Sequence, residues 1–190
     1  MGGVDPADAY QRAAALFGET LSSLSDDEWE RPTRPEGWTV VSTVAWVVVG
    51  DAHIATAVAG DPIGATADFD AAILGLQPVA TWRGTAVAAI GALREPGALA
   101  RSVAHPGGTL AVADLVGQRV TENLVRAWDI GEAVGRPVEI PDDLAEWCLD
   151  FWAGHADAIL AGGVLPDQPL EPVAGAGPAQ RLLALTGRRT

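Results

Sequence analysis

The stretch that most constrains this chain is residues 118–133, QRVTENLVRAWDIGEA, which carries the densest charge in an otherwise apolar sequence. On a helix its charged residues share one face, because they follow each other at spacings of three, four and three: Arg119, Glu122, Arg126 and Asp129. Apolar residues between them can pack a core. Two alternatives follow. The charged row is either a solvated outer face with local ion pairs or a polar row that points into a cavity.

The composition limits which domain organisation and which binding partners can be expected. The chain has 190 residues, of which 48% are hydrophobic, so a sizeable core is available and global disorder is not expected. We expect a helical bundle over residues 1–161 and a C-terminal extension over residues 162–190 that packs on the same domain. The net charge is −13, and all twelve basic residues are arginines. A nucleic-acid partner is therefore not expected, because a phosphate-binding surface needs clustered basic residues.

Cysteine content and hydropathy indicate in which cellular compartment the protein is expected. The single cysteine, Cys148, excludes a disulfide framework within the chain, and its setting EWCLDFW predicts a buried core thiol. The N-terminus is acidic and lacks the apolar stretch of a signal peptide. The longest apolar run, residues 40–50, is too short to cross a bilayer, and Asp51 and His53 interrupt its continuation. We expect a cytoplasmic protein without a membrane partner.

Helical periodicity and capping residues predict most of the secondary structure. Asp5 followed by Pro6 starts a helix to about residue 24, and Thr39 caps a second one. The valine-rich start of that second segment also suits a buried strand, but the apolar pattern continues to residue 59, which favours a helix. Further helices are expected over residues 81–94, from the cap Thr109 to 134, from the cap Asp142 to 160, and over 179–185.

These elements predict an all-α fold. The intervening segments are rich in glycine and proline, notably residues 25–38, 95–108 and the tail at 162–178, and none shows a convincing strand pattern. We expect a four-helix bundle with short extra helices and a Gly/Pro-rich C-terminal tail.

Common catalytic motifs are not found in this sequence. The segment PGGTLAVADLVG has glycines but neither the Lys-Ser/Thr ending nor the preceding strand of a phosphate loop. No G-x-S-x-G is present. The three histidines lie in three separate segments, which argues against a metal triad built from them: His53, His105 and His155.

Three segments together resemble the DinB/YfiT-like superfamily, and within it the metal-binding domain family of mycothiol-dependent maleylpyruvate isomerase. They are RPTRPEGWTVVSTVAWVVVGDAHIATAVAG, VTENLVRAWDIGEAVG and the ending AQRLLALTGRRT. The resemblance implies a four-helix bundle with a divalent metal, usually zinc or nickel, at the base of a pocket. Its metal ligands fall at Trp46, Glu122 and Arg126 of this chain. It also implies thiol-dependent isomerase or transferase activity.

This chain departs from the family at the metal ligands. An indole N–H only donates, and a guanidinium is cationic without an acceptor, so of the three positions only Glu122 can bind a metal. We therefore predict a degenerate metal site and no cofactor. Arg126 would place a fixed positive charge there, with Glu122 and Asp129 in reach as partners. The result is either a working metal-free pocket or a dead site repaired for stability.

The first function hypothesis is a metal-independent enzyme of secondary metabolism, of isomerase or cyclase type, acting on a small aromatic or conjugated organic acid. Trp46 and Trp38 would form a flat wall for the ligand. Arg126 would stabilise negative charge, and Glu122 or His53 would move a proton. The substrate-binding set is completed by the two remaining charged residues of the row, Arg119 and Asp129.

Two alternatives remain open. One is an ordinary family member that binds zinc or nickel through His53, Glu122 and another group, and uses a thiol. The other is a non-catalytic bundle that dimerises or binds a protein. The expected partner is a small-molecule ligand, and a homodimer is compatible with each hypothesis.

Overall fold

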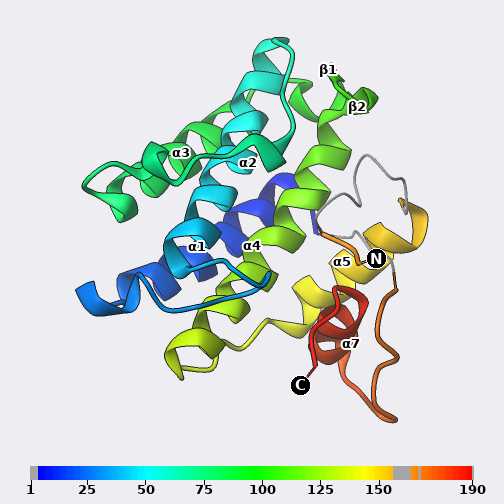
Figure 1. The fold of residues 1–190 in the computed structure, drawn as a ribbon. Helices are drawn as coiled ribbons and strands as arrows, with labels where there is room; N and C mark the ends of the chain where they lie inside the picture. The colour runs from blue at the N-terminus through cyan, green and yellow to red at the C-terminus, as the bar shows by residue number, and fades with distance from the viewer. Residues whose placement is uncertain (1–3, 156–163, 167, 190) are drawn as a thin grey trace.

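The computed structural model describes residues 4–155, 164–166 and 168–189. Figure 1 shows its helices: α1 (Pro6–Ser22), α2 (Val40–Ala59), α3 (Pro78–Leu93), α4 (Val112–Val134), α5 (Asp142–Gly154) and α7 (Pro178–Leu185). Single 3₁₀ turns lie in the connections: η1 (Asp26–Glu28), η2 (Thr66–Asp68), η3 (Ala71–Leu74) and η4 (Ala98–Ala100). The expected all-α class is confirmed.

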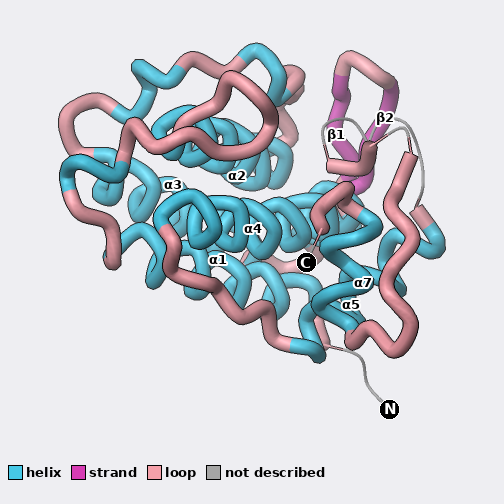
Figure 2. The backbone as a smooth tube through the Cα atoms, turned by 60° about the horizontal axis from the view of Figure 1, so that its bottom comes forward, coloured by secondary structure: helices cyan, strands magenta, loops and turns pink. Residues whose placement is uncertain are grey.

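Helices α1 to α4 form the bundle. Helix α4 packs against both α1 and α2, and α3 packs against α2 and α1, so the four helices close a ring around the core. In Figure 2, α2 and α3 form one layer, and α4 and α1 form the other. Helices α5 and α7 pack on each other beside α4. The apolar core therefore extends from the bundle into the C-terminal part, where Leu182 and Leu183 are buried.

The helix ends follow the local chemistry that the sequence predicts. The Asp5 side chain accepts a hydrogen bond from the Ala7 amide at 2.9 Å, which caps α1 in front of Pro6. Thr39 caps α2, and Gly60 ends it in the left-handed conformation at φ 88°. Gly135 ends α4 in the same way, at φ 69°.

A β-hairpin before α4 was not expected. Strands β1 (Ser102–His105) and β2 (Gly108–Ala111) pair antiparallel, with Val103 opposite Leu110. Thr109 therefore lies in a strand, and α4 begins at Val112 with Ala111 as its N-cap. Four-residue strands are too short for alternation to be recognised beside a Pro-Gly-Gly turn.

The fifth helix also differs at its start, and part of its predicted range lies outside the described residues. Its N-cap residue is Pro141, so Asp142 is the first helical residue rather than the cap. An acidic residue there still suits the positive end of the helix dipole. The predicted continuation over residues 156–160 falls outside the described residues.

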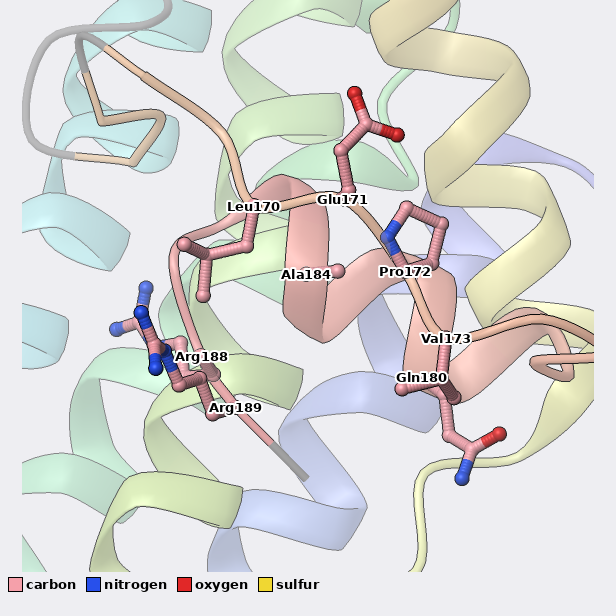
Figure 3. Close-up of a pocket in the computed structure, with 8 residues that line it drawn as sticks. All are labelled: Leu170, Glu171, Pro172, Val173, Gln180, Ala184, Arg188 and Arg189. Carbon is pink, nitrogen blue, oxygen red and sulfur yellow. The ribbon is translucent and has the colours of Figure 1, made fainter.

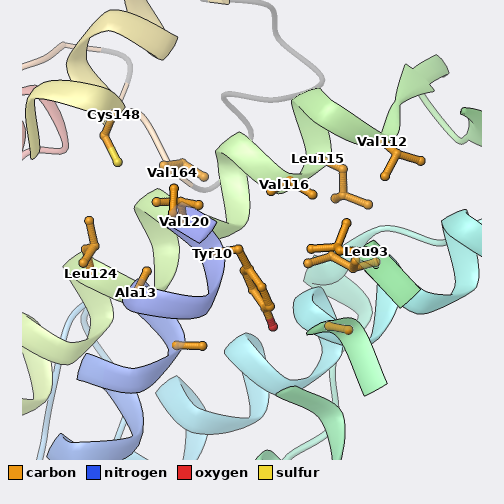
Figure 4. Packing of buried hydrophobic residues seen from close by; sticks show 14 of the residues in the cluster. Tyr10, Ala13, Leu93, Val112, Leu115, Val116, Val120, Leu124, Cys148 and Val164 are labelled. Atoms are coloured by element: carbon orange, nitrogen blue, oxygen red, sulfur yellow. The ribbon is translucent and has the colours of Figure 1, made fainter. Parts of the chain in front are cut away.

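Helix α2 is long and apolar enough, by length and composition, to cross a membrane, but 61% of its most apolar window is buried inside the protein. It is packed as a core helix between α3 and α4. Figure 4 shows the neighbouring part of the core, where side chains of α4 meet Tyr10, Ala13 and Cys148. Burial raises the pKa of the Cys148 thiol to about 12, as suits a core thiol.

Candidate functional site

The charged row of α4 points into the protein. Its four residues are 1–3% exposed: Arg119, Glu122, Arg126 and Asp129. The alternative of a solvated outer face is therefore wrong. Helix α4 is covered by α1 and α2 and, farther round, by α5, which leaves the row no access to bulk water along most of its length. Buried charges require partners, and the row has them in two separate clusters.

The first cluster is centred on Arg126. Its Nε donates to Glu122 Oε2 at 2.8 Å, and its Nη1 donates to Asp129 Oδ2 at 3.1 Å. Nη1 also donates to the backbone carbonyl of Arg34 at 3.3 Å, which ties the loop before α2 to α4. The two carboxylates raise the pKa of Arg126 despite its burial, so the guanidinium is a fixed positive charge.

Aromatic rings cover one side of this guanidinium. Its carbon lies 5.4 Å from the Trp38 ring centroid and 5.9 Å from the Trp46 ring centroid, within cation–π range. The two indoles and Phe69 contact one another, with centroids 5.0–5.8 Å apart. The tryptophans therefore lie directly behind Arg126. A flat ligand has no room between them and the guanidinium in this conformation.

Arg188 joins this cluster from the C-terminal end. Its Nε and Nη2 donate to the two oxygens of Asp129 at 3.1 and 2.7 Å, across 59 residues of sequence. Its side chain is 8% exposed. Sequence reasoning missed this residue. Arg188 and Arg189 stand together in the ending AQRLLALTGRRT, and a pair of arginines in a tail normally indicates solvated charge.

A hollow of about 310 Å³ opens on the outer side of Arg126. Its described lining comes from the loop before α2, from α4 and from two C-terminal segments: Arg34, Pro35, Arg126, Val164, Leu165, Pro166, Thr186, Gly187 and Arg188. A ligand can thus approach Arg126 from this side, away from the indoles.

Two buried polar atoms next to Arg126 have no hydrogen-bond partner in the described part of the chain. They are Glu122 Oε1 and Trp46 Nε1. Leaving such groups unpaired costs about 1–3 kcal/mol each, and more for a charged one. A buried group without a partner needs an explanation, and a catalytic role is one such explanation.

The second cluster lies two helical turns away along α4, about 10 Å by helix rise. Arg119 Nε donates to Asp51 Oδ1 at 2.8 Å, and Asn123 and Tyr10 donate to the same carboxylate. Burial raises the pKa of Asp51, and the Arg119 charge opposes that effect. Arg119 therefore belongs to a separate buried network that joins α1, α2 and α4, and not to the Arg126 cluster.

His53 belongs to the surroundings of this second network. Burial, followed by the positive charge of Arg119 and the neighbouring His105, lowers the pKa of His53 to about 4. The side chain is therefore neutral at pH 7. His53 lies two turns along α2 from Trp46, so the structure does not bring it to the Arg126 cluster. The predicted site thus divides: Trp38, Trp46, Glu122, Arg126 and Asp129 come together, whereas Arg119 and His53 lie apart.

The comparisons with known proteins give relatives without an assigned function. No family model matches the chain. It is 30% identical over 142 residues to the uncharacterized proteins MT0763 and Rv0738 of Mycobacterium tuberculosis, and the match covers 75% of this chain and 74% of each of them. The chain belongs to the family of these mycobacterial proteins. No activity comes with that membership, because both relatives are uncharacterized.

The fold of this Rv0738 family member is that of a known enzyme. The crystal structure of the mycothiol-dependent maleylpyruvate isomerase matches with a TM-score of 0.56 at 20% identity. A histidine-to-alanine mutant of that enzyme matches with a TM-score of 0.57 at 18% identity. Both matches cover 74% of this chain and 65% of the isomerase, so the chain spans just under two thirds of the enzyme's length. The likeness establishes the fold.

The divalent metal that the sequence resemblance implies does not fit the residues at its expected position. The residues gathered around Glu122 are an indole and a guanidinium, which have no lone pair to offer. Within the described ranges, no three His, Cys, Asp or Glu side chains group so as to hold a metal ion. The two carboxylates nearest the position are already engaged with Arg126. The local positive charge would also repel a cation.

Proposed function

We propose that this protein binds a small aromatic or conjugated organic acid without a metal and rearranges it by proton transfer, as an isomerase or cyclase does. The observation that carries this proposal is the buried Glu122 Oε1, which has no hydrogen-bond partner among the described residues and lies next to the fixed charge of Arg126. A base beside an electrophilic cation in a desolvated site is the pair that proton abstraction next to a carbonyl needs.

The roles divide between the two side chains. Glu122 Oε1 takes a proton from the carbon next to the carbonyl, and the C–H electron pair moves into an enolate. The enolate oxygen lies against Arg126, whose charge stabilises it. The same carboxyl group then returns the proton to another carbon of the conjugated system. One C–H bond breaks and one forms, so no redox partner is required.

The surroundings support these roles. Trp38 and Trp46 lie behind the guanidinium and Asp129 holds its Nη1, so Arg126 is fixed in place before a ligand arrives. Such preorganisation is the main source of electrostatic catalysis. The ligand enters through the hollow in front of Arg126, so the indoles act as supports of the cation rather than as the ligand's stacking wall. Glu122 is not among the described residues that line the hollow, so the proposal requires the ligand to pass beside the Arg126 guanidinium to reach Oε1.

Deuterium exchange tests the proposal directly. Metal-stripped protein is screened with small aromatic and polyketide-like acids by tryptophan fluorescence, and bound acids are followed in D₂O by NMR. We expect wild type to replace a carbon-bound proton by deuterium. Glu122→Gln is the matched control, because it keeps the side-chain volume and should bind the acid without exchanging it.

Three outcomes would contradict this proposal. They are the absence of binding by every acid, exchange that is unchanged in Glu122→Gln, and exchange by the protein as purified that the metal-stripped protein does not show. Stoichiometric zinc or nickel in the purified protein would favour the metal-dependent, thiol-using alternative instead.

A second candidate function is a non-catalytic bundle that binds a second copy or another protein. The observation favouring it is the filled interior, where Trp38, Trp46 and Phe69 pack on Arg126. In this alternative, the Arg126–Glu122 ion pair only stabilises what was once a metal site and binds no ligand. The exchange experiment separates the two candidates, because a non-catalytic bundle would neither bind an acid at Arg126 nor exchange its protons.

A further inference from the structure

The C-terminal segment returns to α4 and is held there by charge. Arg188 forms two hydrogen bonds to Asp129, one to each carboxylate oxygen. Arg188 Nη1 also donates to the carbonyl of Thr186. Gly187 has φ +80°, a left-handed conformation that glycine tolerates, and a Cβ there would lie 3.2 Å from Pro166. The turn therefore places Arg188 in one defined position.

Asp129 brings two guanidinium groups to one point. Its Oδ2 accepts from Arg126 Nη1 at 3.1 Å and from Arg188 Nη2 at 2.7 Å. With Glu122, the other partner of Arg126, the cluster holds two cations and two carboxylates, but neither carboxylate is among the described residues that line the side of the two guanidinium groups that faces outward. That side is the hollow, whose described lining includes three arginines and no acidic residue. An anion is the complementary ligand.

Arg188 keeps hydrogen-bonding capacity for such a ligand. A guanidinium has five N–H groups, and the bonds to Asp129 and Thr186 within the described residues use three of them. Four of the other described lining residues are apolar, namely Pro35, Val164, Leu165 and Pro166. A volume of about 310 Å³ holds a compact molecule.

We propose that Arg188 is a second anchor for the ligand's carboxylate and that residues 186–188 form one wall of the binding site. This inference rests on the proposed function, and it narrows the substrate class to a compact acid with one carboxylate and an apolar body. The carboxylate lies between Arg126 and Arg188, and the apolar body lies against the prolines and Leu165. The site is thus completed by the C-terminal extension rather than by the four-helix bundle alone.

A neighbouring arginine supplies the control. Arg189 is exposed and does not line this hollow. It lines a second hollow, of about 360 Å³, on the other side of Arg188. Figure 3 shows Arg188 and Arg189 side by side at one end of that second hollow, with the Glu171 carboxylate pointing away from them. Arg189→Met removes the same charge from the same segment without touching the proposed site.

The test measures the affinity of full-length protein for benzoate, with benzamide as the neutral isostere, by calorimetry. Wild type should bind benzoate and not benzamide. Arg188→Met should weaken benzoate binding roughly 10- to 100-fold, as expected for losing hydrogen bonds to a charged group. Arg189→Met should bind as wild type does, within about twofold. Circular dichroism checks that each variant is folded.

A second measurement covers the case in which Arg188→Met does not fold. The NMR signal of the Arg188 Nε–H, assigned with Arg188→Lys, should shift when benzoate is added to wild type. An unmoved signal in the presence of bound benzoate would overturn the inference.

The variants also separate this inference from the proposed function. If Arg126→Met weakens benzoate binding while Arg188→Met and Arg189→Met do not, the second anchor is wrong and the Arg126 site stands. If Arg188→Met weakens binding and Arg126→Met does not, the ligand lies at the C-terminal segment alone, and the proposed function is wrong. Equal weakening by Arg188→Met and Arg189→Met indicates only surface attraction and overturns the inference.

Discussion

At the scale of single residues, Arg126 is the centre of the buried charge cluster. It bridges Glu122 and Asp129 on α4 and lies against two indole rings that come from the α2 end. Removal of Arg126 would affect the two carboxylates differently, because only one of them keeps a positively charged partner. Asp129 keeps Arg188 as a partner, whereas Glu122 has Arg126 as its partner among the described residues. Truncation of Arg126 should therefore act mainly through Glu122.

We expect Arg126→Ala to destabilise the protein by roughly 3–5 kcal/mol, because it leaves the 1%-exposed Glu122 carboxylate without its counter-charge. The double variant Arg126→Met/Glu122→Gln should cost much less, since it leaves no uncompensated charge there. Urea denaturation of the three proteins measures the difference. A single variant as stable as wild type would place the pair outside the core.

His53 should make stability depend on pH. Its pKa is lowered to about 4 in the folded protein from 6.5, so the unfolded chain binds the proton more readily. Its contribution is fully present above pH 6.5 and is lost as the pH falls through about 4. Denaturation midpoints of wild type should therefore fall over this range, and His53→Gln should flatten the fall.

The titration of Glu28 sets the lower limit of the pH range in which the effect of His53 can be measured. Its hydrogen bonds, first of all to Arg136, lower its pKa to about 2 from 4.5, so its own contribution is lost below pH 4.5. The comparison of His53→Gln with wild type is therefore made between pH 4.5 and 6.5. Parallel pH profiles of the two proteins there would show that His53 is solvated in the folded state.

At the scale of helices, the contact between α2 and α4 depends on a glycine. A Cβ on Gly50 would lie 2.3 Å from Arg119 Cζ, so the Arg119 guanidinium lies directly on the α2 backbone. We expect Gly50→Ala to push Arg119 away from Asp51 and to cost at least about 1–3 kcal/mol, the usual cost of overpacking. Thermal denaturation measures it.

Gly84 on α3 provides the control for that substitution. Gly84 lies away from the ends of α3 on its exposed face, and a Cβ there would have no neighbouring atom within 4 Å. Gly84→Ala should stabilise the protein by about 0.5–1 kcal/mol, through helix propensity. If both alanine variants changed stability in the same direction, the close approach of Arg119 to Gly50 would be wrong.

The arrangement of α2 and α4 suggests two substitutions that should create a metal site between these helices. Positions 122 and 126 are one turn apart, and the Trp46 ring lies next to the Arg126 guanidinium. Trp46→His together with Arg126→His, with Glu122 kept, should therefore bind zinc or nickel in calorimetric titrations. Either single variant should fail, because one keeps the cation and the other lacks a ligand. A folded double variant that binds neither metal would mean that the two positions do not face each other.

At the scale of the whole molecule, the C-terminal extension shares the core of the bundle. Leu182 is fully buried in the cluster that also contains residues of α1 and α4. Leu182→Ala should destabilise the protein by about 2–5 kcal/mol. Circular dichroism and tryptophan fluorescence should report one coincident transition, because the extension folds with the bundle. Two separate transitions would indicate an independent C-terminal unit.

Much of the fold could be predicted from the sequence because helix ends and periodicity are local. The cap at Thr39, the glycine stops at Gly60 and Gly135, and the 3-4-3 spacing of the charged row all depend on residues within a few positions of each other. The unsuitability of Trp46 and Arg126 as metal ligands is likewise a property of the side chains themselves. The hairpin was missed because its strands are four residues long.

What the tertiary structure decided is which neighbours each charge meets. Spacing alone left the row of α4 open to solvent or to a cavity, and packing by α1 and α2 buried it. The row falls into two clusters, because Arg119 bonds to Asp51, 68 residues away in the sequence, and Asp129 bonds to Arg188, 59 residues away. Such pairings depend on long-range chain geometry that local periodicity does not encode. The sequence alone therefore determined the helices and the donor chemistry, and only the tertiary structure placed Arg188 in the site and His53 outside it.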